Sequence, residues 1–279
     1  MLSIAINNYK NPELLKLCIN SIKKNVKSVE YEIIVADGAT EEDTRLMMQE
    51  DFPDVKFFPF EENVGFGEMA RKGIDESKGD YFLLLNGDIL VTPNSVEKML
   101  EFVKNDKSIG LVGPKILNFN ETLQDSCFRF YKLITIPYRR TFLGKLPFAK
   151  KHLDNFLMKD YDRKESRNVD WLMGSVLMLS RKSFEKVGHL DSRFFMYLED
   201  TDWCRRFWEN GFRVVYFPES EMLHYHGKGS GKGGTIQSLF MNKYTWIHIS
   251  SAIKYFKKYW GKSNPRVEYF EKKSEKDEK

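Results

Sequence analysis

Residues 81–88 are Tyr-Phe-Leu-Leu-Leu-Asn-Gly-Asp. The apolar run Tyr81–Leu85 predicts a buried strand, and the polar triplet 86–88 predicts the turn that ends it. An apolar strand without alternation is typical of a parallel sheet, because helices cover both faces of such a sheet. The stretch therefore predicts an α/β fold in which an acidic residue, Asp88, lies directly beyond a buried strand.

Strand and helix signals alternate on both sides of this stretch. Apolar runs predict strands at residues 2–6, 31–36, 55–60, 81–85, 109–112, 171–179, 213–217 and 221–225. Cap-and-proline signals and helical spacing predict helices that begin near residues 12, 41, 66, 93, 182 and 201. This order predicts a mostly parallel sheet with helices on both faces. Ligands of such sheets bind beyond the carboxyl ends of the strands, where Asn7, Asp37 and Asp88 fall.

The bulk composition excludes several classes of protein. The net charge is only +4, which does not suit a dedicated nucleic-acid binder. Cys18, Cys127 and Cys204 are too few and too widely spaced for a disulfide framework or a zinc pattern, as expected in a reducing compartment. The N-terminal apolar run is too short for a signal peptide, and no apolar run reaches membrane-spanning length. We therefore expect a cytoplasmic protein that binds no nucleic acid.

Three carboxylates lie close together in residues 194–206, Phe-Phe-Met-Tyr-Leu-Glu-Asp-Thr-Asp-Trp-Cys-Arg-Arg. Glu199, Asp200 and Asp202 follow an aromatic run and precede a basic pair. Like charges this close raise one another's pKa, and burial raises it further, which turns a carboxylate into a base. The alternative is structural: Glu199 and Asp200 cap the helix that is predicted to begin near Thr201.

A second group of residues suits a divalent cation and phosphate. Asp88 could share Mg²⁺ or Mn²⁺ with a diphosphate, or it could cap a turn. His224 and His226 end a predicted strand, and in an extended chain they point to the same face. The glycine-rich run 227–234 follows them, and its Lys228 could close over a diphosphate. A plain flexible linker is the alternative for this run.

Together these segments resemble family 2 of the inverting glycosyltransferases with the GT-A fold, and within it the branch that contains bacterial rhamnosyltransferases. The resemblance runs from Ser3 to about Ser230. It rests on six motifs in the family's order: Ala36-Asp37-Gly38, Asn63-Val64-Gly65-Phe66-Gly67, Asn86-Gly87-Asp88, Trp171-Leu172-Met173-Gly174 with Arg181, Glu199-Asp200-Thr201-Asp202-Trp203-Cys204-Arg205, and His226.

The resemblance implies a reaction. A sugar would move from a UDP- or dTDP-sugar to a hydroxyl of a glycan or lipid-linked acceptor, in cell-surface polysaccharide synthesis. The implied mechanism is a single displacement in which Asp200 takes the acceptor proton and Glu199 orients the site. Asp202 would cap its helix or pair with Arg205. A divalent cation, Mn²⁺ or Mg²⁺, would stabilise the leaving diphosphate.

The resemblance also implies which residues bind. The metal ligands would be Asp88, His226 and His224. The residues that bind the donor nucleotide would be Asn7, Tyr9, Asp37, Asn63, Gly65, Arg71, Asn86, Gly87 and Lys228. The acceptor would contact Trp171 and Gly174. Two positions depart from the family pattern: Asn86 replaces an acidic residue, and Arg71 replaces an asparagine, so that Arg71 either reaches a donor phosphate or lies on the helix surface.

Other classes of protein fit the sequence less well. A sugar-1-phosphate nucleotidyltransferase or a dinucleotide-dependent dehydrogenase would carry a glycine-rich loop after its first strand, and residues 7–12 contain no glycine. A non-catalytic nucleotide-sugar-binding protein of the same fold is the remaining alternative. The intact Glu199-Asp200 pair and His226 argue against it.

The sequence predicts three regions. Residues 1–234 form the GT-A catalytic domain, and within them 119–168 interrupt the strand–helix alternation with basic and bulky apolar residues. This insertion is a mobile flap, an acceptor-binding region, a membrane-surface contact or a solvated loop. Residues 235–262 form an amphipathic helix with lysines on its outer face, which docks on the domain or lies peripherally on the inner membrane. The charged residues 263–279 form a disordered tail.

Overall fold

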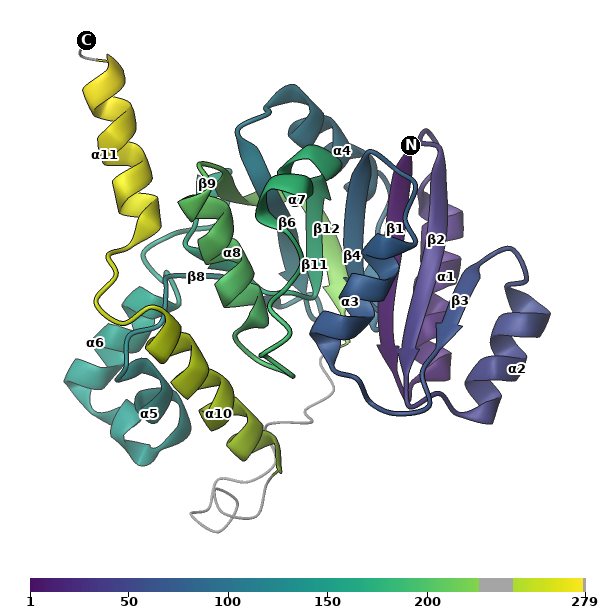
Figure 1. Ribbon diagram of the computed structural model, residues 1–279, viewed down its shortest axis with the longest axis horizontal. Coiled ribbons are helices and arrows are strands. Elements are labelled where there is room, and N and C mark those ends of the chain that lie inside the picture. The colour runs from purple at the N-terminus through teal and green to yellow at the C-terminus, as the bar shows by residue number, and fades with distance from the viewer. Residues whose placement is uncertain (226–242, 278–279) are drawn as a thin grey trace.

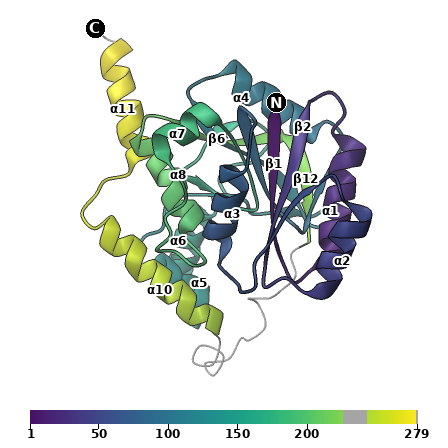
Figure 2. The ribbon, with the colours of Figure 1, turned by 45° about the vertical axis from the view of Figure 1, so that its right-hand side comes forward.

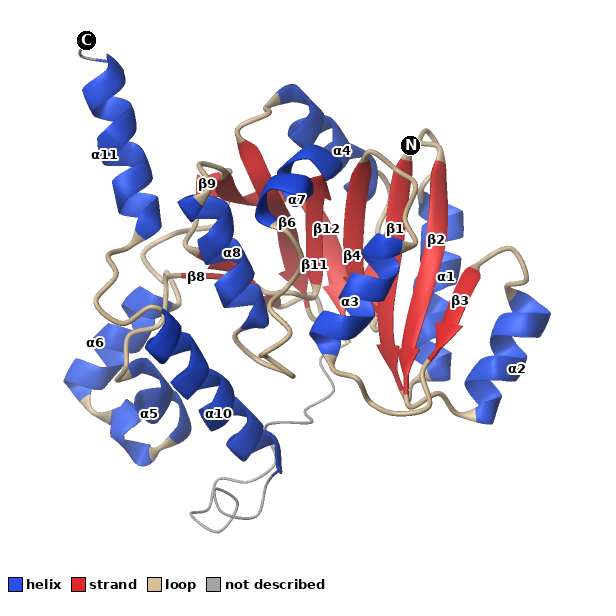
Figure 3. Cartoon of the chain, in the orientation of Figure 1, coloured by secondary structure: helices blue, strands red, loops and turns tan. Residues whose placement is uncertain are grey.

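Four apolar runs of the N-terminal half form one parallel sheet. They are β1 (Leu2–Tyr9), β2 (Tyr31–Gly38), β3 (Lys56–Pro59) and β4 (Tyr81–Asn86). Their register places Ile4 of β1 beside Ile33 of β2 and Leu83 of β4. The carboxyl ends of these strands therefore lie along one edge of the sheet (Figure 3). The computed structural model describes residues 1–225 and 243–277.

The second half of the chain extends the same sheet. Its strands are β5 (Ile89–Val91), β6 (Ile109–Leu117), β11 (Val176–Ser180) and β12 (Arg213–His224), and the order across the sheet is β3-β2-β1-β4-β11-β6-β12-β5. β7 (Leu123–Gln124) pairs with β6, and β9 (Arg167–Asn168) pairs with β12. β11 runs antiparallel to β4 and β6, whereas β12 runs parallel to β6. The predicted α/β fold with a mostly parallel sheet is confirmed, with β11 as an antiparallel insertion.

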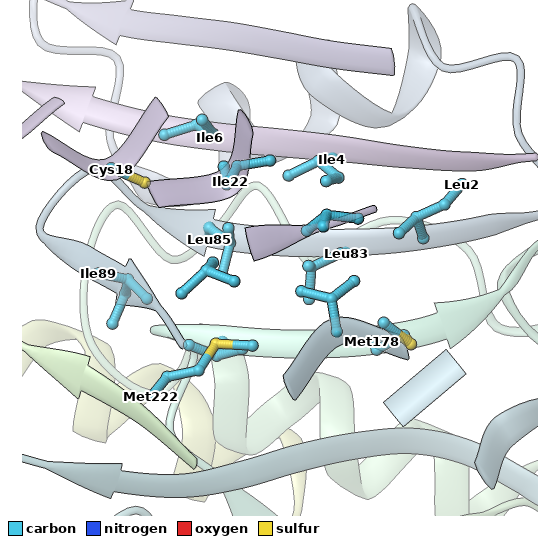
Figure 4. Packing of buried hydrophobic residues seen from close by; sticks show 14 of the residues in the cluster. Leu2, Ile4, Ile6, Cys18, Ile22, Leu83, Leu85, Ile89, Met178 and Met222 are labelled. Carbon is cyan, nitrogen blue, oxygen red and sulfur yellow. The ribbon is translucent and has the colours of Figure 1, made fainter. Parts of the chain in front are cut away.

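Helices cover both faces of the sheet, as predicted (Figure 1). They are α1 (Pro12–Asn25), α2 (Glu42–Asp51), α3 (Phe66–Asp75), α4 (Ser95–Asn105), α7 (Arg181–Val187) and α8 (Glu199–Glu209). Ile4 and Ile6 of β1 join the cluster that includes Cys18 and Ile22 of α1 (Figure 4). Ala5, between them, faces α3 instead, because successive side chains of a strand point to opposite faces.

Two strand predictions are corrected by the structure. The expected strand 171–179 is split into β10 (Trp171–Leu172), which pairs with β8 (Cys127–Phe128) in a separate small sheet, and β11. The expected strands 213–217 and 221–225 are instead one strand, β12, which is interrupted by a bulge between Phe217 and Glu221. A bulge leaves residues unpaired without ending the strand, so the sequence shows two apolar runs.

One helix begins later than predicted. α4 begins at Ser95 rather than at Pro93, because Asn94 takes the left-handed conformation with φ 61°. Asparagine tolerates this conformation better than most residues. The short strand β5 in the segment before α4 is not predicted by any alternation in the sequence.

Residues 119–168 fold into helices for much of their length. α5 (Thr135–Arg140), the 3₁₀-helix η1 (Phe142–Lys145) and α6 (Pro147–Phe156) pack on one another and form what we call the helical lobe. The expected disordered tail 263–279 is also corrected, because Pro265–Asp277 forms helix α11. Tyr269 of α11 packs edge-on against Trp208 of α8, which gives this charged segment an apolar anchor.

The C-terminal helix α10 (Lys243–Lys258) docks on the domain, which was one of the two alternatives for it (Figure 2). Its inner face joins a cluster that combines residues of the helical lobe, the loop before α8 and α10: Ile136, Phe194, Leu198, Ala252, Tyr255 and Tyr259. Among the residues that the structure describes, no helix has both the length and the apolar character that crossing a membrane requires.

A buried carboxylate fixes α10 against α8. The Asp202 side chain has no exposed surface and accepts hydrogen bonds from Lys258 Nζ and from Tyr259 Oη at 2.8 Å. It also accepts one from Arg206 Nε at 2.9 Å, one turn further along α8. The sequence predicted a helix cap or a pair with Arg205. The structure pairs Asp202 with Arg206 instead, because residues four apart lie on the same helix face.

We expect Asp202→Asn to destabilise the protein by about 3 kcal/mol, since it leaves the Lys258 ammonium and the Arg206 guanidinium without their buried partner. Urea unfolding measures this change. The matched control is Asp51→Asn, which removes the surface pair with Lys16 and should change the unfolding free energy by less than about 1 kcal/mol. Equal effects of the two substitutions would contradict the anchoring role.

Candidate active site

A pocket of about 370 Å³ opens at the carboxyl ends of β1 and β4. Three further segments complete it: the start of α3, the break between β10 and β11, and the loop that leads into α8. Its lining residues are Asn7, Asn8, Tyr9, Asn11, Asn63, Phe66, Met69, Asn86, Gly87, Asp88, Met173, Gly174, Ser175, Met196, Tyr197, Glu199 and Asp200. The pocket therefore lies where ligands of parallel sheets bind.

The start of α8 brings two carboxylates into this pocket. Tyr197 and Leu198 both take left-handed conformations, with φ of 69° and 68°, and turn the chain so that Glu199 and Asp200 are the first residues of the helix. Asp200 Oδ1 accepts a hydrogen bond from the Thr201 N–H at 2.7 Å. Asp200 Oδ2 accepts one from Gly174 N–H at 3.0 Å. The break in the expected strand 171–179 thus supplies a backbone donor to Asp200.

Both carboxyls have raised pKa values. Burial raises the pKa of Asp200 to about 6, against the opposing effect of its backbone hydrogen bonds. Burial and the neighbouring Asp200 raise the pKa of Glu199 well above its usual range. When two adjacent carboxyl groups have different pKa values, one can be neutral while the other is ionised. The pair is therefore suited to take a proton from a bound hydroxyl.

The pocket also presents buried polar atoms that make no hydrogen bond with the described residues. They are six side-chain atoms: Asn7 Oδ1 and Nδ2, Asn86 Oδ1, Asp88 Oδ1, Ser175 Oγ and Glu199 Oε2. A buried polar atom without a hydrogen bond costs about 1–3 kcal/mol, so such a concentration in one pocket is expected where a ligand completes the hydrogen bonding. The atoms include both donors and acceptors, which suits a polar ligand.

The nucleotide end of the predicted site is built around Asp37. Its side chain is fully buried and accepts a hydrogen bond from Asn8 Nδ2 at 2.7 Å, so Asp37 lies behind the pocket wall and orients a residue that lines it. Asn63 lines the pocket, and its Oδ1 accepts a hydrogen bond from Gly65 N–H at 3.0 Å. Gly65 has φ 82°, and a Cβ there would lie 2.4 Å from the Phe195 carbonyl oxygen. Only glycine fits this turn.

Asp88 is the strongest candidate metal ligand in the described residues. Its Oδ1 lies 3.3 Å from Nε2 of His224, whose Nδ1 lies 2.9 Å from Gln124 Oε1. A carboxylate oxygen without a hydrogen bond, at the mouth of a polar pocket, fits Mg²⁺ or Mn²⁺, which bind one or two carboxylates together with phosphate oxygens. No group of three His, Cys, Asp or Glu suited to a metal forms within residues 1–225 and 243–277. His226 and Lys228, also predicted here, lie outside the described residues.

Arg71 and Trp171 are predicted binding residues that, like Asp37 and Gly65, are not part of the pocket lining. Arg71 is exposed on α3, with its Nε 3.5 Å from Asp75, which favours the surface alternative over contact with a donor phosphate. Trp171 is only 5% exposed and stacks on Phe128 at 4.3 Å between ring centres. Its indole supports the wall of the site from within the core and does not reach the lining, in contrast to the predicted acceptor contact. Gly174, from the same predicted motif, does line the pocket.

Several lining residues were missed by the sequence analysis. Asn8 could have been found, because it directly follows Asn7 at the end of a predicted strand. Ser175 lies next to a predicted residue but within an expected continuous strand. Met196 and Tyr197 precede the carboxylates, and only the left-handed turn at their position brings them to the pocket.

Two curated relatives resemble this chain over most of its length. N-acetylglucosaminyl-diphospho-decaprenol L-rhamnosyltransferase of Mycobacterium tuberculosis (strain ATCC 25618 / H37Rv) is 25% identical over 232 residues, 78% of this chain and 74% of the relative. Rhamnosyltransferase WbbL of Escherichia coli (strain K12) is 22% identical over 268 residues, 91% of this chain and 92% of the relative.

A solved structure shares the fold. The crystal structure of GalNAc-T7 with UDP, GalNAc and Mn²⁺ aligns with a TM-score of 0.59 and 16% sequence identity, over 81% of this chain. This chain spans only 43% of that structure, so the likeness concerns the fold, which is GT-A. The family model described as glycosyl transferase family 2 matches residues 3–188, more than half of the chain. With the fold and these relatives in agreement, the chain belongs to glycosyl transferase family 2.

Proposed function

We propose that this protein is an inverting glycosyltransferase that moves a sugar from a UDP- or dTDP-sugar to a hydroxyl of a glycan or lipid-linked acceptor. The observation that carries the proposal is the pocket itself, where six unpartnered polar atoms lie together with a carboxyl whose pKa is raised to about 6. The relatives add support, since both are named as rhamnosyltransferases and one name specifies a diphospho-decaprenol acceptor. Polysaccharide assembly at the cell surface is the role that fits these names.

Asp200 is the proposed general base. As the acceptor hydroxyl attacks the anomeric carbon, its proton passes to the Asp200 carboxylate, and the bond from that carbon to the leaving diphosphate oxygen breaks. The attack comes from the face opposite the nucleotide, so the anomeric configuration inverts. The N–H groups of Gly174 and Thr201 hold the carboxylate in place. Glu199, whose pKa is raised well above its usual range by burial and by Asp200, offers a hydrogen bond to the acceptor or to Asp200.

The donor is proposed to bind along the strand ends. Asn7, Tyr9, Asn63, Asn86 and Gly87 line this part of the pocket. The asparagine amides and the Tyr9 hydroxyl suit the polar atoms of a base, a ribose and phosphates. Asp37 acts on the same ligand through Asn8.

A divalent cation is proposed as the cofactor. Asp88 would hold it together with His226, with His224 orienting Asp88 from behind. When bound, such a cation neutralises charge that develops on the leaving diphosphate.

We expect Asp200→Asn to lower the rate of transfer by about 10²–10⁴-fold, the usual contribution of a general base, while nucleotide affinity stays within about threefold of the wild type. Release of nucleoside diphosphate in the presence of acceptor measures the first quantity, and calorimetric titration measures the second. Asp51→Asn, on the surface of α2, is the matched control and should leave both unchanged. Near-normal turnover of Asp200→Asn would rule out the assigned base.

The pKa of Asp200 predicts the pH dependence of the reaction. Only the ionised carboxylate accepts a proton, and burial raises its pKa to about 6, so the rate should rise with pH through about 6 and level off above it. An aspartate in water would place this rise near pH 4. The pH profile of kcat/KM measures the position of the rise. A rate that is constant from pH 4.5 to 7 would contradict the raised pKa or the role of Asp200.

A further inference from the structure

An apolar groove of about 540 Å³ lies between the helical lobe and α10, and no residue in the described part of the chain fills it. Its walls carry side chains from two segments that are more than a hundred residues apart. The principal members are Leu133, Ile136, Pro137, Ile253, Phe256 and Trp260. The groove is separate from the candidate active site and shares no lining residue with it.

The apolar side chains at this groove are unusually exposed. Leu133 is 57% exposed, Ile253 is 63% exposed and Trp260 is 75% exposed. Single exposed apolar residues are common on protein surfaces, but a contiguous group around one groove marks an interaction site. On α10, Ile249, Ile253 and Phe256 are spaced by three or four residues, so they share one helix face, and Trp260 follows two residues after the helix ends.

The charge of the surrounding segments restricts what the groove can bind. Residues 126–156 and 243–262, which include the helical lobe and α10, contain 12 lysines and arginines and one acidic residue, Asp154. The rest of the chain contains 32 lysines and arginines and 39 acidic residues. The region around the groove is therefore strongly positive within a protein whose net charge is only +4. Lys257 lies in the groove wall itself.

We propose that this groove and its basic surroundings dock the protein on the surface of an anionic lipid bilayer. Apolar side chains then enter the boundary between headgroups and acyl chains, where tryptophan is favoured. The basic side chains other than Lys258, which is paired with Asp202, face the lipid phosphates. A second copy of the chain would bring the same positive segments against each other. The chain's own residues 226–242 contain two lysines and no acidic residue, so they do not complement the charge either.

This docking would place the active site at the membrane surface. A second face of α10, beside the one that lines the groove, contacts the loop before α8. Ser251 Oγ donates a hydrogen bond to the Met196 carbonyl at 2.8 Å. The ring centres of His248 and Tyr197 are 5.0 Å apart. Met196 and Tyr197 line the active-site pocket. Where the proposed function holds, a lipid-anchored acceptor would reach the pocket from the same surface. The docking itself does not depend on that function.

Vesicle co-sedimentation tests the proposal without donor or acceptor. The full chain is mixed with vesicles of phosphatidylcholine alone, or of phosphatidylcholine with 30–40% phosphatidylglycerol, at about 50 mM and 500 mM salt. We expect at least tenfold stronger binding to the anionic vesicles at low salt, and a marked loss at high salt, where charges are screened over about a few ångströms. No sedimentation with anionic vesicles at low salt would overturn the proposal.

Two sets of variants separate the groove from a general effect of charge. The triple variant Leu133→Gln, Ile253→Gln, Trp260→Gln keeps every charge and should bind the anionic vesicles at least tenfold more weakly. Its control is Leu17→Gln, Leu46→Gln, which alters exposed leucines on α1 and α2 and should bind as the wild type does. Melting temperatures of all three proteins check the fold. A triple variant that is folded and binds vesicles like the wild type would overturn the groove as the docking site. The same holds if the triple substitution abolishes self-association of the protein but leaves vesicle binding unchanged.

A fluorescence measurement gives an independent readout. The emission of Trp260, which is 75% exposed, should shift to shorter wavelength when anionic vesicles are added. The difference between the wild type and Trp260→Gln isolates this residue from the other tryptophans. An unchanged difference spectrum on vesicle binding would place the contact elsewhere on the molecule.

Discussion

The buried carboxylate of Asp202 is the constraint on which the arrangement of the active site depends. It holds α8 to α10 through Lys258 and Tyr259, and it pairs with Arg206 within α8. A buried charge is tolerated only where partners surround it, so α8 has one favourable position. That position places the first residues of α8, Glu199 and Asp200, in the pocket lining. Of the three clustered carboxylates, one therefore holds the two helices together and two line the pocket.

The pocket combines parts from separate segments of the chain. The ends of β1 and β4 supply amide side chains, and Asp88 follows directly after β4. The break between β10 and β11 supplies the Gly174 N–H to Asp200, and the turn at 197–198 supplies the carboxylates. Four of the six polar atoms without hydrogen bonds lie at the ends of β1 and β4, and the raised pKa values occur at the start of α8. This separation suits a site that binds a polar donor on one side and activates a hydroxyl on the other.

Much of this arrangement could be predicted from the sequence, because parallel sheets bring strand ends together whatever their loops do. Asp88 was found in this way, whereas the carboxylates of α8 were found because three acids lie within four residues. The break within 171–179 could not, since it depends on the contact between Gly174 and α8, and apolar periodicity continues through it. The composition of residues 263–279 predicts disorder, because it does not reveal that Tyr269 packs against Trp208 of α8. Contacts between distant segments account for both differences.

Binding of nucleoside diphosphates tests the central claim most directly. The melting temperature of the wild type and of Asp88→Asn would be measured with UDP, dTDP and GDP, each with and without Mn²⁺. A ligand that binds only the folded state raises stability by RT ln(1 + [L]/Kd). The account predicts a Mn²⁺-dependent rise with UDP or dTDP for the wild type that is lost in Asp88→Asn. No rise with any nucleotide, or an equal rise in both proteins, would contradict a donor site at the ends of β1 and β4.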